Sequence, residues 1–119
     1  MILDAIEEKL KEVDPCVFYG VAENIDSESL WNYIVFDRKL VKLNENKTSF
    51  IYRYRVHIVR EVWVPEGIEE EVIKKMLEIK GMKLATNDMQ YTRTTKGNTG
   101  AVVEALTIEF SRSVIRKVA

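Results

Sequence analysis

The stretch Phe50–Val64, FIYRYRVHIVREVWV, decides the fold, because polar and apolar side chains alternate along it. A period of two residues is that of a β-strand with one buried face. The stretch exceeds the usual strand length of about 3–10 residues, so we expect it to bend or to project beyond its sheet. Pro65 ends it, because proline cannot donate to a strand ladder. The expected core face holds Phe50, Tyr52, Tyr54, Val56, Ile58 and Val62, and the opposite face holds Arg53, Arg55, His57 and Glu61.

Two further strands are expected upstream. Cys16–Val21 and Leu30–Phe36 are rich in β-branched and aromatic residues, and the polar run Ala22–Ser29 between them is typical of a loop. Asp37–Ser49 alternates weakly and contains the turn signal Asn44-Glu45-Asn46-Lys47. We expect this segment to form an extended hairpin with a solvated tip, and therefore an arm at residues 37–49.

Two segments instead have the spacing of helices. Apolar residues recur every three or four positions over 2–13, where Asp14-Pro15 ends the pattern, and again over 68–80. In the second segment acidic residues come first and lysines last, which the helix dipole favours. Gly81 fits the position just after this helix, where a left-handed conformation is common.

The C-terminal third returns to strand patterns. Gln90–Thr95 and Ala101–Phe110 are expected strands, joined by the turn Lys96–Gly100, while residues 82–85 are left open as a short strand and 111–117 as a basic end. The expected order is α-β-β-β-α-β-β. The sequence thus predicts an α+β fold, a single domain over residues 1–119 with an antiparallel or mixed sheet and two helices packed on it.

Composition excludes several classes of protein. The chain holds 18 basic and 19 acidic residues, a formal net charge of -1, whereas a protein that mainly neutralises phosphates should be visibly basic. No apolar run approaches the roughly 18 residues of a membrane span, and the N-terminus lacks the pattern of a secretory signal. The single cysteine, Cys16, favours a reducing compartment, so we expect a soluble cytosolic protein without membrane contact.

Residues that carry chemistry are scarce. His57 and Cys16 are the only histidine and cysteine, too few for a zinc site, and no third group at a recognisable spacing would orient them as a nucleophile pair. The turn Lys96–Gly100 lacks the phosphate-loop pattern and does not open a helix. Glu69, Glu70 and Glu71 are expected to serve the helix dipole. We therefore expect no enzyme and no cofactor.

Basic side chains off the core face suggest an interface. Tyr52 and Tyr54 lie on the opposite face of the strand from Arg53 and Arg55. Aromatic rings that could stack on nucleic-acid bases are therefore not on the same face as the cations that could bind phosphates, and we expect no specific nucleic-acid binding. A charge-balanced chain can instead pair its arginines with carboxylates of a second copy. The candidate assembly-interface residues are Arg53, Arg55, Lys39, Lys42, Lys47 and Arg93.

The order of several motifs is similar to that of a known family. The chain resembles the small tail-terminator proteins of long-tailed bacteriophages and prophages, also called tail-completion, minor capsid or head–tail joining proteins. The resemblance runs through nearly the whole chain, over Trp31–Phe36, the strand end Val62-Trp63-Val64-Pro65-Glu66-Gly67, the helix 68–80, Gln90–Lys96 and Val103–Phe110.

The resemblance implies a structural virion protein without an active site. Such proteins form rings, commonly hexameric, that cap the tail tube and face the head connector. The implied partners are further copies of the chain, the tail tube protein and the head–tail connector protein, and the implied location is the virion, or the host cytoplasm during assembly. The arm at 37–49 and the long strand would then contact a neighbour or the tube. The alternative is a small α/β binding module for nucleic acid or a host protein.

Overall fold

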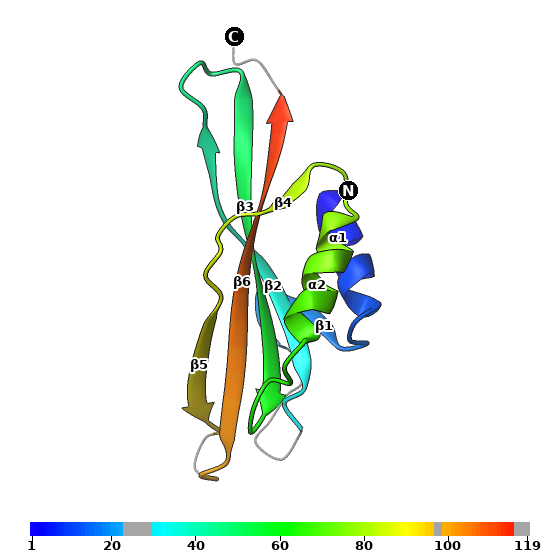
Figure 1. Cartoon of the computed structure of the whole chain (residues 1–119), viewed down its shortest axis with the longest axis vertical. Helices are drawn as coiled ribbons and strands as arrows, with labels where there is room; N and C mark the ends of the chain where they lie inside the picture. The colour runs from blue at the N-terminus through cyan, green and yellow to red at the C-terminus, as the bar shows by residue number, and fades with distance from the viewer. Residues whose placement is uncertain (23–29, 97–98, 116–119) are drawn as a thin grey trace.

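A mixed β-sheet, covered on one face by two helices, forms the body of the molecule (Figure 1). The computed structural model describes residues 1–22, 30–96 and 99–115. The sheet has six strands in the order β1-β2-β3-β6-β4, with β5 also paired to β6. The molecule is elongated, 54 × 26 × 24 Å, because its three central strands continue well beyond the helices. The α+β class is confirmed.

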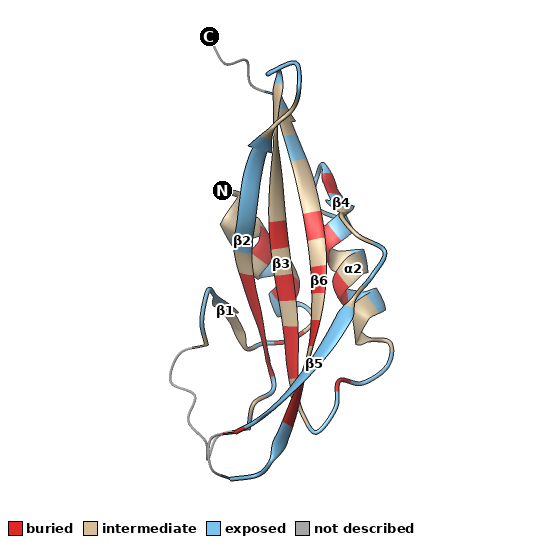
Figure 2. Ribbon diagram, turned by 90° about the vertical axis from the view of Figure 1, so that its left-hand side faces the viewer, coloured by how far each residue is buried: buried red, intermediate tan, exposed pale blue. Residues whose placement is uncertain are grey.

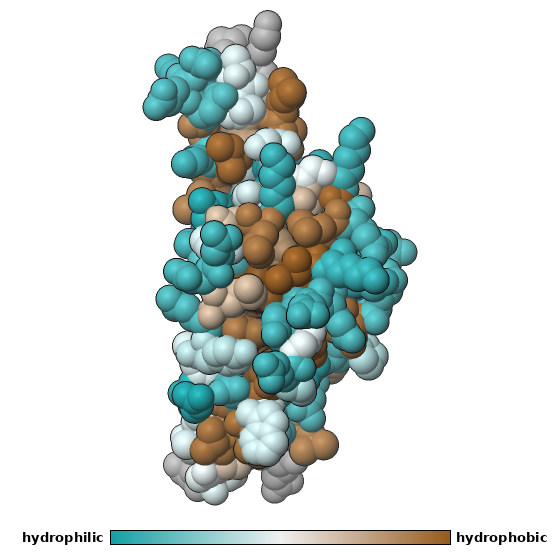
Figure 3. Space-filling model, in the orientation of Figure 1, coloured by the Kyte–Doolittle hydropathy of each residue, from teal (hydrophilic) through white to brown (hydrophobic). Residues whose placement is uncertain are grey.

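The helices α1 (Ile2–Lys11) and α2 (Ile68–Leu77) pack side by side on the sheet. Their buried residues Ile6, Leu10, Val72 and Met76 meet one face of the central strands. Each such side chain contributes about 1.5–3 kcal/mol of hydrophobic stabilisation. Figure 3 shows hydrophilic side chains over the outer surface of the helices and hydrophobic ones between helices and sheet.

Both helices end earlier than the sequence predicts. The apolar spacing continues into the turns that follow, where Val13 and Ile79 still pack against the core, so periodicity alone overestimates each length. Gly81 has a φ of +83°, which confirms the left-handed position expected there, although it follows a turn and not the last helical residue.

The central strands are β2 (Tyr33–Leu43), β3 (Ser49–Glu61) and β6 (Val102–Ile115). β3 lies antiparallel between the other two, and it pairs with β6 along its full length, from Ser49 opposite Ile115 to Glu61 opposite Val103. The alternation in β3 is confirmed at Tyr54, Val56 and Ile58, which are all buried on the helix side.

Three details of these strands differ from expectation. Val62 is not a core residue: its φ of +69° ends the strand, and its side chain is 56% exposed. β2 contains a bulge between Arg38 and Leu40. β6 continues to Ile115, so most of the expected basic end is strand, because the far half of β3 supplies it with a partner.

The three central strands form an arm beyond the helices. We define the arm as residues 38–43, 49–53 and 111–115, joined by the turn at 44–48. Figure 2 shows buried residues concentrated in the lower and middle parts of the strands, whereas the arm is exposed or half-buried. The hairpin expected at 37–49 is therefore present as part of a three-stranded ribbon.

Short strands complete the two edges. β1 (Val17–Tyr19) pairs parallel with β2 on one side. On the other, β4 (Met82–Leu84) and β5 (Gln90–Thr95) both pair antiparallel with β6, one after the other along the same edge. The segment that the sequence left open is thus a strand in addition to the expected order. Of the expected loop 22–29, turn 96–100 and basic end 111–117, residues 23–29, 97–98 and 116–117 lie outside the described residues.

The helix-free face of the sheet also buries apolar side chains in its lower half. Tyr33, Val35, Val59 and Val103 form a second cluster, against which Phe18 and Trp31 pack. The first four residues of β2, Tyr33–Phe36, are therefore buried on both faces of the sheet, as their apolar composition predicts.

Asp14 and Arg60 connect the end of α1 to the sheet. Arg60 Nη2 lies 2.8 Å from Asp14 Oδ2, and both side chains are nearly buried. Asp14 Oδ1 also accepts the backbone N–H of Cys16 at 2.8 Å, while Arg60 donates to the carbonyl of Val59. This ion pair fixes the chain where it turns from the helix into β1.

Candidate assembly interface

Three of the predicted interface residues lie together on the helix-free face, at the base of the arm. Arg53 and Arg55 are two residues apart on β3 and so share this face, and Lys39 reaches it from the β2 bulge. β2 contributes Asp37 and β6 contributes Glu109, which is directly opposite Arg55 in the register. The result is a charged cluster that we define by Asp37, Lys39, Arg53, Arg55 and Glu109.

Each cation of this cluster has a carboxylate partner in the same chain. Arg55 donates two hydrogen bonds to Asp37, from Nε to Oδ1 at 2.9 Å and from Nη2 to Oδ2 at 3.1 Å. Lys39 Nζ donates to Glu109 at 3.0 and 3.1 Å, and Arg53 Nη1 lies 3.5 Å from the same carboxylate. The carboxylates expected from a second copy are therefore supplied by neighbouring strands of the same chain, and Arg53 and Arg55 connect these strands by ion pairs.

His57 borders the cluster. Its Nδ1 lies 2.9 Å from Thr107 Oγ1, and its Nε2 lies 3.9 Å from Asp37 Oδ2. Burial lowers the pKa of His57 below its ordinary value, against the opposing attraction of Asp37, and Arg55 lowers it further. A hydroxyl, an imidazole and a carboxylate thus meet, but the carboxylate is held by Arg55 and is too far from Nε2 to orient the ring. The arrangement supports a structural hydrogen bond.

The other predicted residues lie elsewhere. Lys42 is near the end of the arm on β2, Lys47 is in its turn with a φ of +56°, and both are exposed. Arg93 is on β5 at the opposite edge of the sheet, where its Nη2 lies 3.0 Å from Glu104 Oε2. The buried Glu104 also accepts the backbone N–H of Val64 at 2.8 Å. The six residues therefore belong to three places.

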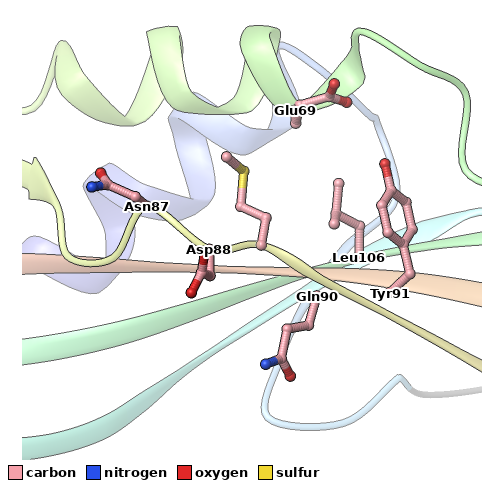
Figure 4. A pocket seen from close by; sticks show the side chains of 7 residues that line it. Glu69, Asn87, Asp88, Gln90, Tyr91 and Leu106 are labelled. Carbon is pink, nitrogen blue, oxygen red and sulfur yellow. The ribbon is translucent and has the colours of Figure 1, made fainter.

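A groove beside β5 contains residues that the sequence did not single out. One part, about 550 Å³ in volume, is lined by Glu69, Asn87, Asp88, Met89, Gln90, Tyr91 and Leu106. Figure 4 shows Glu69 of α2 and the hydroxyl of Tyr91 directed to the same space, while Asp88 and Gln90 point to the other side of the strand. A second part, about 490 Å³, adds Trp63, Glu66, Arg93 and Glu104. Of its lining residues, only Arg93 is predicted from the sequence as an interface residue.

Across residues 1–22, 30–96 and 99–115, no three His, Cys, Asp or Glu side chains meet in a group able to hold a metal ion. Within the same ranges, neither helix reaches the length and apolarity that a membrane crossing requires.

Comparison with models of known protein families finds no family that matches this chain, and comparison with curated proteins finds no match either. The interpretation of the interface therefore rests on its geometry and its charges.

Proposed function

We propose that this chain is a structural subunit of a long-tailed phage or prophage virion, which forms a ring that terminates the tail tube and joins it to the head connector. The observation that carries the proposal is the arm. The arm buries little apolar surface, and Leu40, Val41 and Ile115 in it remain exposed. A chain that needed only to bury its core would therefore not continue three strands past its helices.

The charged cluster supports the same role. Asp37, Glu109 and their cations join β2, β3 and β6 where the arm leaves the part of the sheet covered by helices. An exposed ion pair contributes at most about 1 kcal/mol, but several that share carboxylates restrict the direction of the ribbon. A subunit that must place an arm on a neighbour benefits from such stiffness, because less conformational freedom is lost on binding.

The proposal is tested by disrupting the gene in the phage or prophage that carries it. We expect induced cells to accumulate tails that are overlong or not joined to heads, with heads and tail tubes each formed normally, as seen by electron microscopy. Expression of the intact gene from a plasmid should restore joined particles. Normal infectious particles from the disrupted strain would exclude the tail-terminator role.

One observation favours the alternative, a binding module for nucleic acid. The β2 strand of the arm and the turn that follows it carry Arg38, Lys39, Lys42 and Lys47 against a single acidic residue, Glu45. If this charge serves phosphates, the protein should bind single-stranded DNA with an affinity that falls steeply as salt rises, and Lys42→Glu with Lys47→Glu should reduce the salt slope by about 2. Absence of binding at 50 mM salt would exclude this alternative.

A further inference from the structure

Besides the outer edges of the three-residue strands β1 and β4, the sheet leaves two longer strand edges unpaired within the described residues. β1 covers the outer edge of β2 only from Ile34 to Phe36, so this edge is open from Arg38 to Leu43. β5 pairs with β6 on one side and with no described strand on the other, and its six residues are all exposed. An open edge presents a row of N–H and C=O groups to which another chain can pair.

The two edges carry opposite charge. The β2 edge and its turn hold the four basic side chains named above, and neither Lys42 nor Lys47 forms an ion pair within the described residues. The groove beside β5 holds Glu66, Glu69, Asp88 and Glu104, and its one basic residue, Arg93, is already paired. The basic β2 edge thus has an acidic counterpart at the opposite edge of the same sheet.

Exposed apolar side chains accompany both edges. On the arm, Leu40 is 44% and Val41 51% exposed. Beside β5, Trp63 is 67% and Tyr91 48% exposed. Large aromatic residues often contribute most of the binding energy of an interface, where they pack on apolar side chains of the partner and are surrounded by more polar contacts. Trp63 and Tyr91 are residues of this kind.

We propose that the β2 edge of one copy pairs antiparallel with the β5 edge of the next, in continuity of the sheet, and that this is the seam of the ring proposed above. When Val41 faces Tyr91 of the next copy, both lie on the helix side of the joined sheet, since Val41 pairs with Tyr52 of the core face and Tyr91 with Leu106.

This register also places the charges. Lys42 then falls opposite Gln90 on the helix-free side, diagonal to Asp88, and Leu40 falls opposite Thr92. The direction is consistent, because β2, β3, β6 and β5 alternate in direction and the β2 of the next copy continues the alternation. Such a contact joins two different patches of the subunit, so its repetition gives either a ring or an open filament. The arm and β5 lie at different heights along the sheet, and the repetition closes into a ring when the tilt of the strands compensates for this difference in height.

The pairing is tested by exchanging charges across the seam. Lys42→Glu and Asp88→Lys should each weaken self-association by roughly tenfold or more, measured by sedimentation. The double variant Lys42→Glu/Asp88→Lys, which restores opposite charges, should recover association. Lys74→Glu, on the exposed surface of α2, is the matched control and should associate as the unmodified protein does. Additive weakening in the double variant would overturn the pairing.

Cross-linking tests the contact directly. Val41→Cys and Tyr91→Cys are made separately in a Cys16→Ser background and mixed at roughly 1 mM protein, high enough to populate a weak complex. A short bifunctional maleimide should join the two variants to each other and neither to itself. Failure to form the mixed product overturns the proposed seam. Rings without that product would leave the ring-forming function standing, whereas the mixed product with normal particles from the gene disruption would leave the seam and exclude the tail role.

Discussion

His57 is the residue whose environment most changes its chemistry. It lies half-buried against Thr107, with Asp37, Arg55 and Glu109 as the charged groups that affect it, and burial lowers its pKa. In the unfolded chain its pKa returns to about 6.5, so the unfolded state binds the proton more readily than the folded one. Stability contributed by neutral His57 is therefore present above pH 6.5 or so and falls as the pH drops below it.

This prediction has a direct measurement, because His57 is the only histidine. An NMR titration of the folded protein should give one imidazole transition, with a pKa below about 6.5. In urea denaturation at pH 7.5 and pH 5, the unmodified protein should lose more stability on acidification than His57→Gln, which cannot titrate. Equal losses in the two proteins would contradict the effect of burial.

Asp14 gives a second prediction at the residue scale. Replacement by alanine would leave Arg60 nearly buried without its carboxylate, so Asp14→Ala should lower the free energy of unfolding by about 3–5 kcal/mol. Asp4→Ala, on the exposed side of α1, should change it by no more than about 0.5 kcal/mol. Both values come from denaturant titrations. A loss below 1 kcal/mol for Asp14→Ala would mean that water replaces the carboxylate.

Among the elements, β3 shows what the sequence could and could not predict. Its alternation is a local property, so its strand state and core face follow from side-chain order. Which carboxylates meet Arg53 and Arg55 depends on register with β2 and β6, and no local pattern sets the pairing of Arg55 with both Asp37 and Glu109. The sequence therefore singles out the two arginines, but it assigns to another copy the carboxylates that the structure supplies from the same chain. The groove beside β5 was missed for the same reason.

Val62 supplies the prediction at this scale. A β-branched residue is strained at a φ of +69°, where the Cβ atom costs roughly 1–2 kcal/mol, whereas glycine adopts this conformation freely. Val62→Gly should therefore leave stability unchanged or raise it by up to about 1 kcal/mol. Val41→Gly is the matched control: Val41 is similarly exposed but extended, so this change should lower stability by about 0.5–1 kcal/mol. The same sign for both variants in thermal melts would refute the strain at Val62.

At the scale of the whole molecule, folding and the proposed assembly use different parts of the chain. All of the buried apolar residues described lie outside the arm: in β3 they begin at Tyr54, and in β6 they end at Phe110. The helices, the lower sheet and the second cluster can thus form a core without residues 39–53. The arm contributes charge and an exposed strand edge, to which another chain can pair.

A shortened chain tests this separation. Arg38 and Tyr54 are directly paired, so residues 39–53 can be replaced by Asn-Gly, which favours a two-residue hairpin turn. We expect the variant to unfold cooperatively, with native near-ultraviolet circular dichroism and a lower melting temperature, since Tyr52 no longer packs on the core and Glu109 loses two cations. It should remain monomeric at concentrations where the full chain associates. A variant that cannot fold would show that the arm belongs to the folding unit, and one that still forms the full assembly would remove the arm from the interface.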